Sequence, residues 1–111
     1  MDNSLKESLD HANKMKVFNN QLRLLKEKYL ERNIHFTVGH QFTIDLKLIN
    51  YCITLKNQNK IKDVIMLDDY DLPVRIKDLD TFYNNIMDLY QQNLNAYIVE
   101  YNKLVQDKGR I

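Results

Sequence analysis

Turn-forming residues are scarce in this chain, whose 111 residues include two glycines and one proline. Because glycine and proline supply the backbone angles of tight turns, a chain with so few of them forms few sharp connections. Long helices joined by short segments satisfy that restriction. The hydrophobic fraction of 44% and the charged fraction of 28% are typical of a folded protein. At this length we expect a single domain over residues 1–111.

The first third of the chain repeats apolar residues at three- and four-residue steps. This spacing predicts one amphipathic helix of roughly 28 residues, about 40 Å long. Ser4 followed by Glu7 forms a capping-box pattern at its start, and Asp2 and Asn3 are neighbouring cap candidates. The expected apolar stripe consists of Leu5, Leu9, Ala12, Met15, Phe18, Leu22, Leu25 and Tyr29.

The middle of the chain predicts shorter elements. Apolar and polar residues alternate on both sides of Gly39, which predicts a short strand or hairpin there. Residues 43–55 have two interpretations. A helix capped by Thr43 and reaching Leu55 gives a polar strip of Lys47, Asn50 and Thr54, whereas alternating apolar residues in the same segment fit a strand. We favour the helix.

A hairpin and a long helix are expected to complete the fold. Residues 63–67 predict a buried strand, residues 68–71 a turn, and residues 72–76 a returning strand in which Pro73 marks an edge or a bend. Asp78 is expected to cap a final helix that ends near Gly109. The apolar stripe of that helix consists of Leu79, Phe82, Ile86, Leu89, Tyr90, Leu94, Tyr97, Tyr101 and Leu104.

The predicted fold class is therefore α+β and mostly helical. Two long terminal helices pack with a short central helix and a small antiparallel sheet, in the order α-β-α-β-β-α.

Residues that could carry chemistry do not occur in catalytic or metal-binding patterns. Neither C-x-x-C nor H-E-x-x-H spacing links the candidate metal ligands, which are His11, His35, His40 and Cys52. The acidic cluster at residues 68–71 lacks the Gly and the terminal Glu of a calcium loop and fits a solvated turn better. Two isolated glycines cannot form a phosphate-binding loop. We expect no enzyme, no cofactor and no catalytic or metal site.

The sequence also predicts a cellular compartment for the protein. A lone Cys52 cannot form an intramolecular disulfide, and the first twenty residues carry charges in place of a signal peptide. No apolar run approaches the roughly 20 residues of a membrane span. We expect a cytoplasmic protein without a membrane partner. Asn, Lys, Ile and Tyr are abundant and Ala is scarce, as in the products of A/T-rich genomes such as those of bacteriophages or low-GC bacteria.

Seven tyrosines give the best indication of an interaction surface. A tyrosine ring suits both the edge of a core and an interface, so the seam they form lies either within one chain or between chains. Acidic residues dominate positions 63–90 and basic residues positions 43–62, which favours a protein partner or self-association as a homodimer over nucleic acid. The candidate interface residues are Leu22, Leu25, Tyr29, Tyr90, Leu94, Tyr97 and Tyr101.

Residues 64–79, followed by a tyrosine-rich helix that ends at residues 101–104, resemble small uncharacterised proteins of contractile-tailed (myovirus-type) marine phages. Residues 9–14 and 18–20 resemble the N-terminal helices of the same group. One departure is that Gly39 stands alone where a glycine-rich turn is expected. The resemblance implies a phage structural or assembly component of the host cytoplasm or the virion, and it brings no activity and no site residues. The alternative is an accessory regulator that binds host RNA polymerase or nucleic acid.

Overall fold

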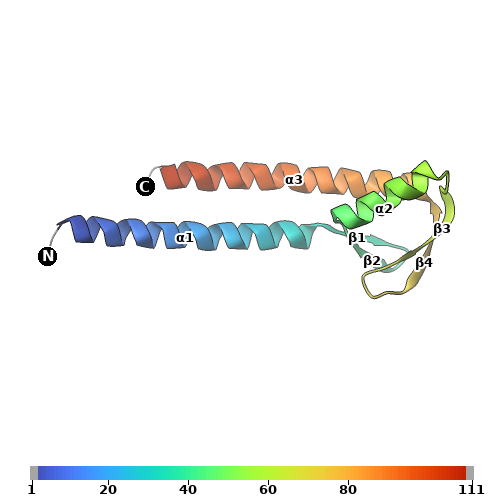
Figure 1. Cartoon of the computed structure of the whole chain (residues 1–111), viewed down its shortest axis with the longest axis horizontal. Coiled ribbons are helices and arrows are strands. Elements are labelled where there is room, and N and C mark those ends of the chain that lie inside the picture. The colour runs from blue at the N-terminus through green and yellow to red at the C-terminus, as the bar shows by residue number, and fades with distance from the viewer. Residues whose placement is uncertain (1–2, 110–111) are drawn as a thin grey trace. The chain divides into compact units, whose positions relative to one another are not determined.

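The computed structural model describes residues 3–109, and contacts divide the chain into two compact units. We call residues 1–30 and 94–111 the helix-pair unit and Glu31–Asn93 the core unit. The elements are α1 (Asn3–Arg32), β1 (Ile34–Thr37), β2 (His40–Thr43), α2 (Leu46–Asn57), β3 (Lys62–Leu67), β4 (Pro73–Asp78) and α3 (Leu79–Gly109) (Figure 1). This confirms the α+β, mostly helical class and the order α-β-α-β-β-α. The single domain stays a prediction.

Helix α1 is 30 residues long and contains neither glycine nor proline. Because Asn3 is already helical, Ser4 lies inside the helix, and the prediction that Ser4 caps it is wrong. Asn3 is likewise not the cap, and the third candidate, Asp2, lies outside the described residues. At the other end Arg32 occupies the last turn, where a positive charge is favourable to the helix dipole.

Strands β1 and β2 form an antiparallel hairpin with a two-residue loop. Thr37 pairs with His40, so Val38 and Gly39 make the whole connection. Both loop residues have positive φ angles, 50° for Val38 and 77° for Gly39, which is the pattern of a type I′ turn. Glycine adopts such angles freely, but a β-branched valine does so with strain.

Helix α2 confirms the helical interpretation of residues 43–55 but begins later than predicted. Its N-cap is Asp45, whose carboxylate accepts the Leu48 N–H at 2.8 Å. The prediction that Thr43 caps this helix is wrong, because Thr43 is the last residue of β2. Its backbone N–H and its hydroxyl are both donated to Asp69, so the hydroxyl serves no helix end.

The end of α2 is a Schellman motif, a structure that the sequence suggested only as a polar connector. The Lys60 N–H donates to the Leu55 carbonyl at 2.9 Å, and the Asn59 N–H donates to the Lys56 carbonyl at 3.0 Å. Asn59 takes the left-handed position with φ 59°, which asparagine tolerates better than most residues. The motif stops the helix without a glycine.

Strands β3 and β4 form the second antiparallel hairpin, separate from the first. The prediction that β3 is buried is wrong for one of its faces, since Met66 is 3% exposed but Ile65 is 49% exposed. A two-stranded sheet has one face on the core, and neighbouring side chains point to opposite faces. Pro73 is the first residue of β4, a position that needs no amide donor.

The predicted cap of the last helix is confirmed. Asp78 directly precedes α3, and its carboxylate accepts the Asp80 N–H at 3.1 Å and the Thr81 hydroxyl at 2.9 Å.

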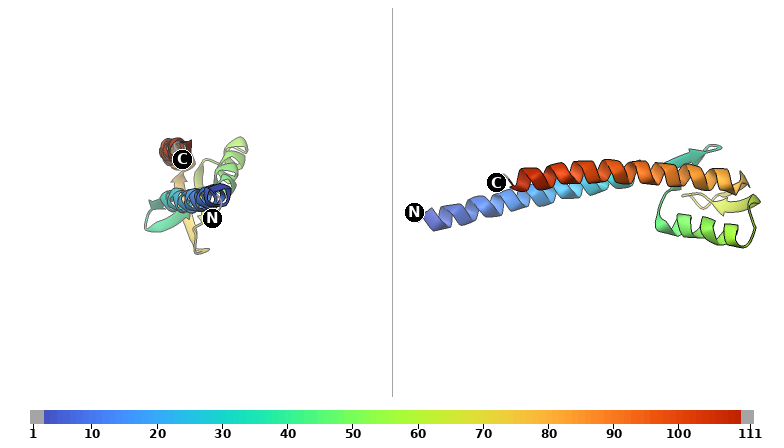
Figure 2. Two further views of the ribbon diagram at one scale, coloured as in Figure 1. Left: turned by 90° about the vertical axis from the view of Figure 1, so that its left-hand side faces the viewer. Right: turned by 90° about the horizontal axis from the view of Figure 1, so that it is seen from above.

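The hydrophobic core lies in the core unit, where α2, the strands and the first turns of α3 meet (Figures 1 and 2). The rings of Phe42 and Phe82 pack edge to face in it, with centroids 5.2 Å apart. Its buried members are Phe42, Ile44, Ile49, Cys52, Leu55, Met66, Val74, Ile76, Leu79, Phe82 and Ile86.

Candidate interaction surface

The acidic turn between β3 and β4 ties the two hairpins of the core unit together. The Asp69 N–H donates to the Gln41 carbonyl at 2.9 Å. In return the Asp69 carboxylate accepts the Thr43 N–H at 2.8 Å, the Thr43 hydroxyl at 2.7 Å and the Gln41 side-chain amide at 2.9 Å. Asp69 therefore holds the turn between β3 and β4 against β2.

Asp68 organises the turn itself. Its side chain is 2% exposed, and Oδ1 accepts the N–H groups of Tyr70 and Leu72 at 2.8 and 2.9 Å. Its Oδ2 lies 2.7 Å from His40 Nδ1. The hydrogen bond from His40, helped by those from Leu72 and Tyr70, lowers the pKa of Asp68 against the cost of burial. The acidic turn thus has a structural role.

The remaining candidate ligands and nucleophiles are dispersed. Cys52 is fully buried in the core, and burial raises the pKa of its thiol to about 11, so the thiol stays protonated near neutral pH. His35 packs edge to face on Phe82, and burial lowers its pKa. Within residues 3–109 no three His, Cys, Asp or Glu side chains gather in a way that could hold a metal ion.

Most of the predicted interface residues lie along the seam between α1 and α3. In the helix-pair unit the Tyr29 and Tyr97 rings meet edge to face at 4.9 Å, and Tyr97 stacks on Tyr101 at 6.5 Å. Leu25 is buried there, while Leu22 and Leu94 are partly buried. In the core unit Tyr90 packs on the hydrophobic core. The tyrosine contacts are therefore made within one chain, and a role for these residues toward another molecule stays a prediction.

A polar contact accompanies the seam. Lys28 Nζ lies 3.0 Å from Glu100 Oε1, joining α1 to α3 within the helix-pair unit. The lysine is more than half exposed, so the ion pair adds little stability and mainly fixes which faces of the two helices meet.

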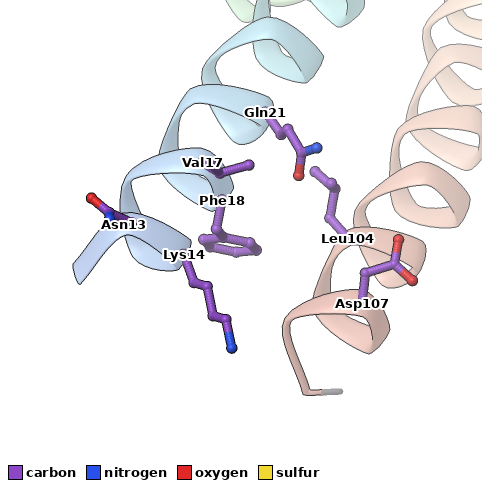
Figure 3. Close-up of a pocket in the computed structure, with 7 residues that line it drawn as sticks. All are labelled: Asn13, Lys14, Val17, Phe18, Gln21, Leu104 and Asp107. Carbon is purple, nitrogen blue, oxygen red and sulfur yellow. The ribbon is translucent and has the colours of Figure 1, made fainter. Parts of the chain in front are cut away.

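A shallow apolar groove of about 220 Å³ opens between the middle of α1 and the last turns of α3 (Figure 3). Phe18 from α1 and Leu104 from α3 both point into the space between the two helices, as Figure 3 shows. Its full lining is Asn13, Lys14, Val17, Phe18, Gln21, Leu104 and Asp107. The groove exists because two helices alone cannot surround the side chains that they direct at each other.

Exposed apolar side chains are the main feature of this unit. Leu25, at 9% exposure, is the single buried residue among residues 3–30 and 94–107, the part of the unit whose side chains are described. Leu5 and Leu9, predicted to lie on the packed stripe, are half exposed, because the first turns of α1 extend beyond the described end of α3 (Figure 1). The exposed large apolar residues are Leu5, Leu9, Val17, Leu24, Leu30, Ile98, Val99 and Val105.

Six of these residues, all except Leu5 and Leu9, lie outside the stripes predicted from the sequence, and four of the six are regularly spaced. Val17 and Leu24 are seven residues apart, and so are Ile98 and Val105. A repeat of seven beside the main stripe indicates a second apolar line on each helix. The predicted interface residues include the tyrosine stripe, which lies on the face that the chain covers itself.

Comparison with known proteins gives no assignment: no protein-family model, no curated protein and no solved structure matches the chain. Among the described residues, no helix combines the length and the apolar character needed to cross a membrane.

Proposed function

We propose that this chain is a non-enzymatic protein-interaction module that acts through the surfaces of its paired helices. One observation carries the proposal: the helix-pair unit exposes apolar side chains along both helices and buries Leu25 alone among its described side chains. Large apolar side chains that stay exposed along a helix are typical of a protein-binding face. Helical faces of this kind bind other helices.

The placement of the reactive residues supports the non-enzymatic part of the proposal. The Cys52 thiol is buried and protonated, and the carboxylates of Asp68 and Asp69 are engaged in holding the hairpins. Each of these groups has a structural explanation.

We place the module among phage structural or assembly components, acting in the host cytoplasm or in the virion. The support is the resemblance of residues 64–79 and 101–104 to proteins of contractile-tailed phages, together with the A/T-rich codon character of the composition. The alternative, a regulator that binds host RNA polymerase or nucleic acid, predicts retention on DNA that weakens with salt.

Site-specific photo-cross-linking in cells that express the protein tests the proposed interaction face. A photoreactive amino acid replaces Leu24 or Ile98 in turn, and the matched controls replace Lys26 on α1 and Lys103 on α3, which lie on other sides of the same helices. We expect cross-links to protein, including a second copy of the chain, from the apolar positions and few from the lysine positions. Equal yields from both sets would contradict the proposal.

A further inference from the structure

Helix α3 carries a heptad pattern on an open side of the helix-pair unit. Ile98 and Val105 are seven residues apart, as are Leu94 and Tyr101, and the two pairs interleave at three- and four-residue steps. At 100° per residue these four side chains occupy a sector about 60° wide. Ile98 and Val105 are exposed, whereas Leu94 and Tyr101 are partly buried. The stripe is therefore only partly covered by its own chain.

Charge is excluded from this sector over residues 94–107, and the stripe ends at the next heptad position, which is Lys108. The charged residues among positions 94–107 are Glu100, Lys103 and Asp107. All three lie at least about 120° around the helix from the centre of the stripe. The residues that border the stripe on its solvent side are Asn95 and Asn102, which are polar and uncharged.

The pattern favours a second copy of the chain as the partner. In a parallel seam between two copies each stripe residue meets its own counterpart, so any charged residue would meet a like charge. A stripe without charge meets that requirement. β-Branched residues at one heptad position, here Ile98 and Val105, with leucine at the other, here Leu94, favour two parallel strands.

We propose that α3 pairs in parallel and in register with α3 of a second copy through Leu94, Ile98, Tyr101 and Val105. This inference rests on the proposed function and names its partner. The two-fold axis runs along the seam, so the Leu94 ends of both copies lie together. The described stripe covers about 20 Å of helix. A contact of that length belongs with the small protein interfaces, so we expect a dimer whose population depends on protein concentration.

Cysteine cross-linking tests the register. In a parallel seam the Cα atoms of two Ile98→Cys residues come within the roughly 4–7 Å that a disulfide requires. Val99→Cys is a matched control, because Val99 is the adjacent residue, is also β-branched and is 53% exposed against 49% for Ile98. Under mild oxidation at micromolar protein we expect a disulfide-linked dimer from Ile98→Cys and little from Val99→Cys. Equal cross-linking rates, or none, would overturn the proposed register.

Charge substitution at the same position tests self-pairing. Ile98→Glu and Ile98→Lys each place like charges opposite one another, and each should weaken the dimer by roughly tenfold or more. A mixture of the two variants should restore dimers, since glutamate then faces lysine. Sedimentation measures the mass, and circular dichroism confirms that helical content is retained. Gln106→Glu, on another side of α3, should leave the wild-type affinity unchanged.

The outcomes separate this inference from the proposed function. A wild-type protein that stays at the 13.3 kDa monomer mass up to millimolar concentration overturns self-pairing. If cross-links from Ile98 in cells then lead to a different protein, the proposed function stands while this inference fails. If the apolar positions cross-link to no protein at all, both fail. A mixture of Ile98→Glu and Ile98→Lys that remains monomeric while wild type dimerises would overturn the parallel arrangement.

Discussion

The core unit and the helix-pair unit use the same kinds of residues and reach different degrees of burial. Eleven buried apolar residues form the cluster in the core unit, from helices and strands that meet on several sides. In the helix-pair unit two helices meet along one line, and Leu25 is the single buried residue among those whose side chains are described. An apolar stripe in the sequence therefore indicates which face of a helix can be buried. How much of that face is buried depends on the number of elements that surround the helix.

Polar groups differ between the units in the same way. In the core unit the side-chain amide of Asn93 donates to the Asn33 side chain at 2.8 Å and to the Arg32 carbonyl at 2.9 Å, and both asparagines are buried. Buried, satisfied hydrogen bonds of this kind fix one arrangement of the elements. The helix-pair seam instead contains contacts that tolerate small displacements, among them the tyrosine rings and the partly exposed ion pair of Lys28 and Glu100.

The largest expected effect comes from a charge in the core unit. Ile86 is fully buried, so Ile86→Asp places an unpaired carboxylate among apolar side chains and should cost about 4 kcal/mol or more. Leu25→Asp in the helix-pair unit should cost less than half as much, because water reaches the seam from both sides. Urea denaturation followed by circular dichroism measures both. Equal losses would show that the helix pair is as closed as the core unit.

A smaller loss of stability is expected when the hydrogen bonds by which Asp69 connects the two hairpins are weakened. In Asp69→Asn one acceptor oxygen becomes an amide nitrogen, so at least one donor from Thr43 or Gln41 loses its acceptor. We expect a loss of about 1–2 kcal/mol of unfolding free energy. Asp71→Asn is the matched control in the same turn, since asparagine tolerates the positive φ of that residue. The control should change stability by less than about 0.5 kcal/mol.

Acid should weaken the core unit through Asp68. Its pKa in the folded protein lies below the ordinary value of 3.8, so the unfolded chain takes up the proton first as the pH falls. The stability that the carboxylate contributes is present above pH 3.8 and is lost as the pH falls through the folded pKa. Denaturation series between about pH 5 and pH 2 should show a smaller slope for Asp68→Asn than for wild type. Identical slopes would remove Asp68 as the cause.

The smallest effect is a gain in stability. Val38 is exposed and strained at φ 50°, so Val38→Asn relieves strain and removes no buried surface. We expect stabilisation by up to about 1 kcal/mol, seen as a higher melting temperature. Val38→Ala, which removes the branch but keeps the disfavoured angle, should gain less. A destabilised Val38→Asn would contradict the turn geometry.

Sequence periodicity predicted the elements well where local signals agree. The two long helices, the cap at Asp78 and the position of the hairpins follow from spacing and from turn residues. The cap of α2 could not be predicted in this way, because the hydroxyl of Thr43 bonds to Asp69, 26 residues away. Local sequence contains no information on that competition, so it does not distinguish Asp45 from Thr43 as the cap.

Which face of each helix or strand is buried was harder to predict than where the helix or strand lies in the sequence. Val64, Ile65, Met66 and Leu67 are all apolar, and their composition suits a strand buried on both sides, yet no described element covers Ile65 well. For the interaction surface the sequence favoured large aromatic residues, which the chain packs against itself. The smaller Ile98 and Val105 remain exposed, and their seven-residue spacing was the available signal.

The buried thiol of Cys52 allows the opening of the core unit to be measured separately from motions of the helix-pair unit. A cysteine enclosed in the core and protonated near neutral pH reacts with a thiol reagent only when its surroundings open. The rate of its labelling therefore records how often the core unit opens, and fraying of the two long helices does not register in it. Because the chain has this one cysteine, thiol labelling of the native protein measures the opening of the core unit without any substitution.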